Sequence, residues 1–366
     1  MRRILLLTAP LSAAGGIVGH GIYFLARQTY GFDDRQNLLL AAAIFLPYVP
    51  AALLAGPVGR RLGQRRAILG VNAVCVAAGL ALATTPPAWA LWLLAPLYNA
   101  AAGMFWPLVE GYVAGGRHGA ALHRSLGWFN LTWSAALAPA LWIVGLVGHS
   151  LLATFGAMVA LHLGVGIAAL GLAARPPEHP AEARPEPSAL YRARLRACRV
   201  LLPVSYMVMD ALAPLLPSVW SRAGVAVGLG AALSSTWMLA RFLAFAGLVA
   251  WSGWRGSGAF LVAGTVALLA GFGVVLGLPG LGAALLGLAA FGAGQGALYY
   301  ASLYYGMSAG DDAVDSGGKH EAVIGAGYLA GPALALLGTA VGVNPVHVVG
   351  AAATGGAAWA WARARR

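Results

Sequence analysis

The sequence predicts an all-α integral membrane protein with twelve transmembrane helices, arranged as two pseudo-symmetric six-helix bundles. Three observations predict this fold class. Of 366 residues, 60% are hydrophobic and 9% are charged, whereas a soluble domain carries about 25% charged residues. The apolar residues fall into twelve runs, each close to the roughly 20 residues that span a bilayer. One polar segment, residues 175–199, separates six runs from six.

The expected helices are separated by turn-forming residues. Breaks such as Thr85-Pro86-Pro87 contain Pro or Gly, which end helices. The expected spans are residues 4–26, 37–59, 67–85, 88–114, 125–147, 151–174, 200–221, 229–250, 258–277, 281–305, 320–341 and 345–361. The first span follows Met1-Arg2-Arg3 and so is similar to a secretory signal peptide. Because it continues to Ala26 and has a counterpart in the second half, we interpret it as a transmembrane helix.

The basic residues predict the orientation of the chain. With the N-terminus in the cytoplasm, 19 Arg and Lys residues fall on the cytoplasmic side and three, Arg27, Arg35 and Arg222, on the other. Loops rich in Arg and Lys stay inside, so both termini are expected in the cytoplasm. This asymmetry accounts for the net charge of +12 without nucleic acid as a partner.

The composition also predicts the domain organisation. We expect an N-terminal six-helix bundle (1–174), a cytoplasmic linker (175–199) with a short amphipathic helix near Tyr191–Arg199, and a C-terminal six-helix bundle (200–366). The halves repeat weakly at an offset of 193 residues, which pairs Pro10 with Pro203 and Pro139 with Pro332. Parallel repeats of this kind occur in transporters, where the solute site lies between the halves.

The loop after the second span resembles a known signature. It contains Gly56, Arg60, Arg61, Gly63 and Arg65, in a pattern similar to the gating loop of the major facilitator superfamily. The two sets of six helices and the basic linker resemble the same superfamily. Arg60 stands where that loop usually has an Asp, so the charge network that braces the inner gate in the superfamily lacks its acid here.

The eleventh span carries a second resemblance. Its segment 325–332 ends in Gly331 and Pro332, a helix hinge similar to the Gly-xxx-Gly-Pro element of the superfamily's exporters, which usually lies in the fifth helix. The resemblance covers essentially the whole chain and is to uncharacterised bacterial members. It implies a secondary transporter of the bacterial inner membrane in which helices 1, 4, 7 and 10 line a central cavity, with 2, 5, 8 and 11 beside them.

Polar and aromatic residues on those helices are candidates for solute binding or coupling, because polar groups within a span usually face a cavity or a partner. They are Asp210, Arg241, Trp237, Gln295, Tyr299, Asn99, Trp106, Glu110, Asn130 and Trp133. We expect Asp210 and Arg241 to pair. The pair is either a proton-responsive or solute-binding site, or a structural bridge between helices 7 and 8.

The other titratable residues each allow two interpretations. Glu110 is either a coupling acid or, as we favour, a salt-bridge partner of Arg117 or Arg124. Glu321 is either functional or, as we favour, a carboxylate that stabilises a helix N-terminus. The group His20, Tyr23 and Arg27 is either an outer gate or a solvated helix end.

These features predict transport of a small organic solute by alternating access. An aromatic cavity with few acids favours proton-coupled export of an amphiphilic compound. The alternatives are an importer of a sugar-like or other organic solute, and a non-transporting membrane sensor or assembly protein, which the altered loop at Arg60 would suit. Two cysteines, and the lack of a metal or nucleotide-binding motif, predict no enzymatic activity, no cofactor and no metal. We expect a monomer whose partners are the solute, protons and lipid.

Overall fold

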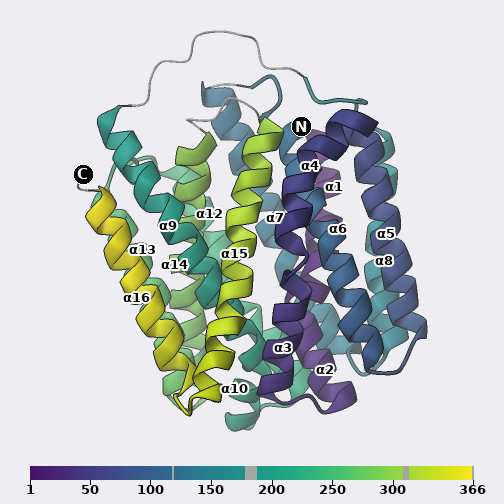
Figure 1. Cartoon of the computed structure of the whole chain (residues 1–366), viewed down its shortest axis with the longest axis vertical. Helices are drawn as coiled ribbons and strands as arrows, with labels where there is room; N and C mark the ends of the chain where they lie inside the picture. Colours follow the sequence, from purple (N-terminus) through teal and green to yellow (C-terminus); the bar gives the residue numbers. More distant parts are fainter. Residues whose placement is uncertain (118, 178–187, 308–312, 365–366) are drawn as a thin grey trace.

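The chain folds into long helices that run nearly parallel to the longest axis of the molecule (Figure 1). The computed structural model describes residues 1–117, 119–177, 188–307 and 313–364, except for the side chains of residues 307 and 313–316. The first half contains α1 (Arg2–Gly16), the π-helical turn η1 (Ile17–Gly21), α2 (Ile22–Tyr30), α3 (Asp34–Phe45), α4 (Tyr48–Leu62), α5 (Gln64–Thr84), α6 (Trp89–Ala114), α7 (Gly119–Val147) and α8 (Leu151–Leu170).

The second half follows the same plan. It contains α9 (Ala189–Leu212), the 3₁₀ turn η2 (Ala213–Leu215), α10 (Leu216–Arg222), α11 (Val227–Ser234), α12 (Thr236–Ala250), α13 (Gly258–Gly277), α14 (Leu281–Met307), α15 (Ala313–Ala340) and α16 (Pro345–Ala364). The prolines that the 193-residue offset pairs lie in corresponding helices, Pro10 in α1 with Pro203 in α9, and Pro139 in α7 with Pro332 in α15.

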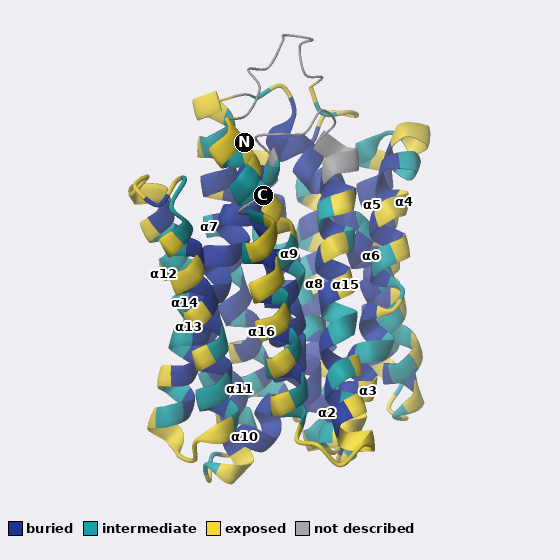
Figure 2. Cartoon of the chain, turned by 60° about the vertical axis from the view of Figure 1, so that its left-hand side comes forward, coloured by how far each residue is buried: buried dark blue, intermediate teal, exposed yellow. Residues whose placement is uncertain are grey.

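The helices are those of an integral membrane protein. Within the described residues, ten helical segments are long and apolar enough to cross a bilayer. Large apolar side chains such as Leu146, Ile167 and Leu286 are more than 70% exposed on the outside of the bundle, as expected where lipid is the solvent. Figure 2 shows such exposed stripes along the outer faces of the helices, with buried residues inside. Since α6 and α16 are long but not among the ten, twelve crossings stay a prediction.

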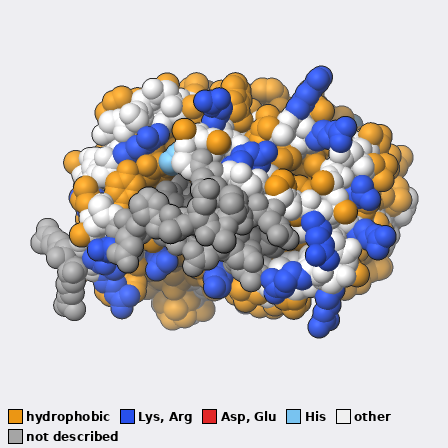
Figure 3. Space-filling model, turned by 90° about the horizontal axis from the view of Figure 1, so that it is seen from above, with side chains coloured by type: hydrophobic (Ala, Val, Ile, Leu, Met, Phe, Trp, Pro, Cys, Tyr) orange, Lys and Arg blue, Asp and Glu red, His pale blue; other side chains and the backbone are white. Residues whose placement is uncertain are grey.

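Both chain ends lie toward one end of the molecule, which we call the linker end because α8 ends and α9 begins there (Figure 1). Seen from this end, Lys and Arg side chains are spread over the face, and no Asp or Glu side chain is visible among the described residues (Figure 3). Exposed arginines here include Arg61, Arg66 and Arg124. This face is the one whose cytoplasmic location the charge asymmetry predicts, and that location stays a prediction.

Some helix boundaries differ from the sequence expectation. The segment Tyr191–Arg199 is helical, but it is the first part of α9 and not a separate short helix. The second span begins at Asp34, three residues earlier than expected, because Asp33 and Gln36 form a capping box. In this motif each side chain accepts a hydrogen bond from the other residue's backbone N–H, so the helix starts one turn sooner.

Glycine contacts set how closely the helices pack. At Gly331, a Cβ would lie 2.1 Å from the carbonyl oxygen of Met207 and 2.8 Å from the amide of Ala211, both backbone atoms of α9. Small residues permit this approach in membrane helices.

We therefore expect Gly331→Ala to destabilise the protein by about 1–3 kcal/mol or more, since a backbone carbonyl cannot rotate away as a side chain can. Thermal unfolding of the purified protein in detergent would measure this effect. Gly350→Ala in α16 is the control, because nothing lies within 4 Å of a Cβ there. If both variants melted alike, close α9–α15 packing would not limit stability.

Candidate functional site

A cavity of about 110 Å³ lies between the two halves. One water needs about 10–15 Å³ measured in the same way, so the cavity holds several. Its wall comes from α1, η1, α3, α4, α6 and α7 in the first half and from α9, α12, α14 and α15 in the second. The lining residues are Ser12, Gly15, Gly19, His20, Phe45, Tyr48, Asn99, Ala102, Trp106, Phe129, Trp133, Leu137, Tyr206, Met209, Arg241, Tyr299, Glu321, Ile324 and Tyr328. These are the helices that the resemblance implied.

At the end opposite the linker, polar side chains join the two halves. The Arg27 Nη1 atom donates to Ser218 Oγ at 2.7 Å and lies 3.5 Å from Asp34 Oδ1, and Ser218 donates to Asp34. Asn37 Nδ2 donates to the carbonyl of Pro214 at 3.2 Å. Arg27 therefore contacts the second half of the chain, whereas the role of the group as an outer gate stays a prediction.

At the linker end, α15 packs against α4 and α6. Tyr48 donates a hydrogen bond to Glu321, and a Cβ on Gly318 would lie 3.0 Å from the carbonyl oxygen of Ala52. The rings of His123 in α7 and Tyr304 in α14 stack at 4.8 Å. The halves therefore contact each other at both ends, and the cavity lies between the two layers of contacts.

Arg241 is the basic group of the cavity wall, and its side chain is 2% exposed. Its Cζ atom lies 4.5 Å from the ring centroid of Trp133 and 4.6 Å from that of Trp237. Its Nη1 atom donates to Gln295 Oε1 at 3.3 Å. Three of the predicted residues, Trp133, Trp237 and Gln295, thus hold the guanidinium in place.

The expected ion pair between Asp210 and Arg241 is wrong for this conformation. Asp210 is fully buried, and neither of its carboxylate oxygens has a hydrogen-bond partner among the described residues. It follows Tyr206 by one helical turn on α9, which places it beyond the cavity wall, toward the end opposite the linker. Asp210 is not among the residues that line the cavity, and helical spacing could not predict its depth relative to Arg241.

The favoured salt bridge of Glu110 is also wrong. Arg117 donates instead to the carbonyls of Tyr112 and Val113, at 2.7 and 2.8 Å. Glu110 is 1% exposed, and its Oε2 atom has no partner within the part of the chain that the structure describes. This oxygen faces α15, where a Cβ on Gly317 would lie 2.6 Å from it.

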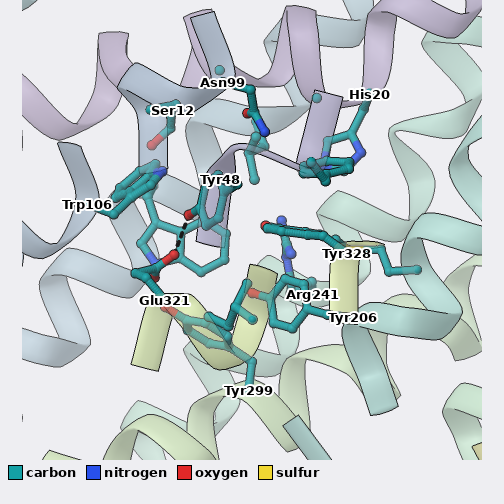
Figure 4. Close-up of a pocket in the computed structure, with 18 of the residues that line it drawn as sticks. Ser12, His20, Tyr48, Asn99, Trp106, Tyr206, Arg241, Tyr299, Glu321 and Tyr328 are labelled. Carbon is teal, nitrogen blue, oxygen red and sulfur yellow. Dashed lines mark hydrogen bonds between the residues drawn. The ribbon is translucent and has the colours of Figure 1, made fainter. Parts of the chain in front are cut away.

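Glu321 does not stabilise a helix N-terminus, contrary to the favoured interpretation. The helix α15 begins at Ala313, so Glu321 lies two turns inside it. Its carboxylate accepts from Tyr48 and faces the cavity (Figure 4). Because Gly317 and Glu321 are four residues apart, they share a face of α15, and Glu110 lies against this face at Gly317.

The remaining predicted residues divide between the cavity wall and its support. Asn99, Trp106 and Tyr299 line the cavity, and Asn99 Nδ2 donates to the carbonyl of Ile44 at 3.0 Å. Asn130 does not line it, but its Oδ1 atom accepts from Trp133 Nε1 at 2.9 Å and so fixes that indole.

Several aromatic lining residues were not among the predicted candidates, including Phe45, Tyr48, Phe129 and Tyr328. The rings of Phe45 and Tyr328 stack at 4.3 Å across the two halves. Tyr328 was detectable, because it follows Glu321 by seven residues and so lies on the same face of α15. Figure 4 shows Tyr48, Tyr206, Tyr299 and Tyr328 around the cavity with Arg241 and Glu321.

Comparison with solved structures identifies this arrangement. The structure of a mutant of the nucleoside transporter NupG superposes with a TM-score of 0.69 and 13% identity, covering 99% of this chain and 98% of that one. The E. coli fucose:proton symporter FucP matches with a TM-score of 0.64 and 13% identity, over 100% and 97% of the two chains. FucP in an outward conformation, titled as a major facilitator superfamily transporter, matches at 0.62 and 15%, over 100% and 98%.

The chain has the major facilitator superfamily fold. The three compared structures are transporters and not enzymes. No protein-family model matches the sequence, and no curated protein matches it. At this level of identity the likeness shows the fold alone.

The loop between α4 and α5, which was predicted to be a gating loop from its resemblance to the superfamily's signature, packs against the end of α8. Gly63 has φ of +80°, which suits glycine. Arg65 Nη1 donates to the carbonyl of Leu172 at 3.2 Å, and Arg65 N donates to that of Ala174 at 3.3 Å. Arg60 and Arg61 are exposed. The loop thus has contacts within its own half although it lacks the usual acid.

Proposed function

We propose that this protein is a secondary transporter that moves a small organic solute across the membrane by alternating access. Twelve helices in two bundles would cross the bilayer, with the linker end in the cytoplasm. The observation that carries the proposal is the cavity between the halves, whose wall includes the buried polar groups of Arg241 and Glu321. Two halves that rock about such a site would expose it to each side in turn.

Proton coupling is the second part of the proposal. Glu110, Asp210 and Glu321 are buried acids at or near the cavity, and an ionised carboxylate is costly within a membrane protein unless it is paired. Uptake and release of a proton by such a group changes the charge between the two halves. The aromatic wall, which includes Trp106, Tyr206 and Tyr299, supports an amphiphilic solute, for which we propose export.

Flux measurements in proteoliposomes test this function. We expect at least one member of a panel of amphiphilic compounds, sugars and nucleosides to move when a pH gradient is imposed. Asp210→Asn should lower the part of that flux that the pH gradient drives, because the amide keeps the shape of the side chain but cannot take up or release a proton at this buried position. Asp33→Asn is the matched control, because Asn caps a helix as well as Asp does and Asp33 lies outside the cavity. A solute flux that does not change with any imposed pH gradient would contradict the proposed proton coupling.

Import of a sugar-like solute is the second candidate. The compared structures include a fucose:proton symporter and a nucleoside transporter, so uptake of neutral sugars or nucleosides in the same panel would favour it. A non-transporting role is less well supported, since Arg241 faces a cavity and is not turned toward the outer helices.

A further inference from the structure

The guanidinium of Arg241 has one edge that is buried and has no hydrogen-bond partner among the described residues. Its Nη1 atom is engaged by Gln295, whereas Nε and Nη2 are buried and have no hydrogen-bond partner among the described residues. In an arginine side chain, Nε–H and Nη2–H lie on the same edge and point in the same direction. This is the edge that binds the two oxygens of a carboxylate in parallel.

The surroundings of Arg241 fix this edge but do not neutralise it. The indoles of Trp133 and Trp237 contact the guanidinium through cation–π interactions at 4.5 and 4.6 Å, which position a cation without cancelling its charge. Gln295 is neutral. Asp210, the acid on the neighbouring helix α9, forms no ion pair with Arg241 in the structure, and both of its oxygens have no partner in the described chain.

An uncompensated cation is costly in a buried site of a membrane protein. A bound anion offsets this cost, because hydrogen bonds between charged groups are stronger than those between neutral groups. The rest of the wall around Arg241 consists mostly of aromatic and apolar side chains, among them Phe45, Phe129, Tyr206 and Tyr328. A complementary ligand therefore has a planar two-oxygen anion at one end and an apolar or aromatic body.

We propose that the cavity binds an organic carboxylate, with the carboxylate on Nε and Nη2 of Arg241 and the hydrophobic body against the aromatic wall. The proposal rests on the proposed function for the idea that the bound molecule is also transported. It is more specific than that function, because it assigns the charge of the solute and the residue that recognises it.

Binding can be measured apart from transport, because Trp133 and Trp237 touch Arg241 and report on the site by fluorescence. The probes are matched acids and amides: benzoate with benzamide, phenylacetate with phenylacetamide, and hexanoate with hexanamide. For the purified full-length protein we expect at least one acid to quench tryptophan fluorescence, with a dissociation constant at least about tenfold lower than that of its amide. Phosphate and nitrate serve as inorganic probes.

Variants of Arg241 assign the effect to the guanidinium fork. Arg241→Gln should weaken binding of the acid about tenfold or more and leave the amide unchanged. Arg241→Lys should also weaken binding of the acid, because an ammonium is a point charge and cannot donate two parallel hydrogen bonds to a carboxylate as a guanidinium does. Arg255→Gln is the control, since Arg255 lies over Tyr304 outside the cavity. This variant should bind the acid as tightly as the parent protein does. The comparison of acid with amide needs no variant, so it stands if Arg241→Gln fails to fold.

Several results would overturn the proposal: no acid in the panel binds, amides bind as tightly as acids, only the inorganic anions bind, or Arg241→Gln keeps full affinity. Flux of neutral solutes that Arg241→Gln leaves intact would also overturn it while the proposed function stands. Conversely, selective binding of acids with no flux of any solute would support the carboxylate site and contradict the proposed transport function.

Discussion

A disulfide between Gly127→Cys in α7 and Val249→Cys in α12 should stop solute flux completely, and a reductant should restore it. A Cβ on Gly127 would lie 3.2 Å from Cγ2 and 3.7 Å from Cγ1 of Val249, so the two side chains would be adjacent, as a disulfide requires. The two residues belong to different halves and lie near the linker end. If the halves must separate there for the cavity to open, the cross-link traps the solute site.

The measurement is efflux from proteoliposomes before and after oxidation, in a background with Cys75→Ala and Cys198→Ala, since both native cysteines are free. The control pair is Gly264→Cys with Ala297→Cys, whose Cβ atoms would lie 3.1 Å apart within the second half. That cross-link joins helices of one bundle and should leave flux unchanged. Undiminished flux through the fully oxidised Gly127–Val249 variant would rule out rocking at this end.

Glu321→Gln should abolish accumulation driven by a pH gradient but retain exchange of solute between the two sides. The amide keeps the shape of the side chain and an oxygen that can accept from Tyr48, yet it cannot take up a proton. The titratable groups around Glu321 include its hydrogen-bond donor Tyr48 from α4. They also include the cavity-lining tyrosines Tyr206 from α9, Tyr299 from α14 and Tyr328 on its own helix. Glu110 from α6 lies against Gly317, one turn before Glu321 on α15. Parent accumulation should rise as the pH gradient steepens, whereas that of the variant should stay level.

Glu110→Gln tests whether the two acids act together. If proton transfer requires both Glu110 and Glu321, either substitution alone should abolish the dependence of solute accumulation on the pH gradient. If only Glu321→Gln removes it, Glu110 has a packing role against Gly317. Asp33→Asn again provides the exposed-acid control. An unaltered response in both variants would exclude this pair from coupling and leave Asp210 as the remaining candidate.

The fold class could be predicted from the sequence because it depends on features that can be read along the chain. Run length and the positions of Pro and Gly suffice to divide the chain into spans, and the corresponding prolines of α1 and α9 were found by offset alone. Arg241, Tyr299 and Trp133 were predicted from polarity and aromatic character on the correct helices, and they do line the cavity.

What the sequence could not predict is the relative depth and rotation of separate helices. Asp210 and Arg241 lie on α9 and α12 at positions whose separation depends on the packing of both helices, so the expected pair is absent. Glu321 was misjudged because α15 begins at Ala313, seven residues before the expected start. With the helix expected to start at residue 320, the cavity-lining Glu321 was wrongly placed at a helix N-terminus. Tyr48 follows the break at Pro47, and no local pattern indicated that it would meet Glu321.

The glycine contacts between helices have a consequence for how such proteins are recognised. At Gly331 against Met207, and at Gly292, whose Cβ would lie 2.0 Å from the carbonyl oxygen of Trp237, the opposing surface is main chain, which is chemically the same in every protein. Elsewhere the outer faces need only be apolar, and many residues meet that requirement equally well. The close approach of α9 to α15 and of α12 to α14 is thus encoded by the absence of side chains at these positions. Searches for related chains should therefore weight the positions of small residues above overall similarity.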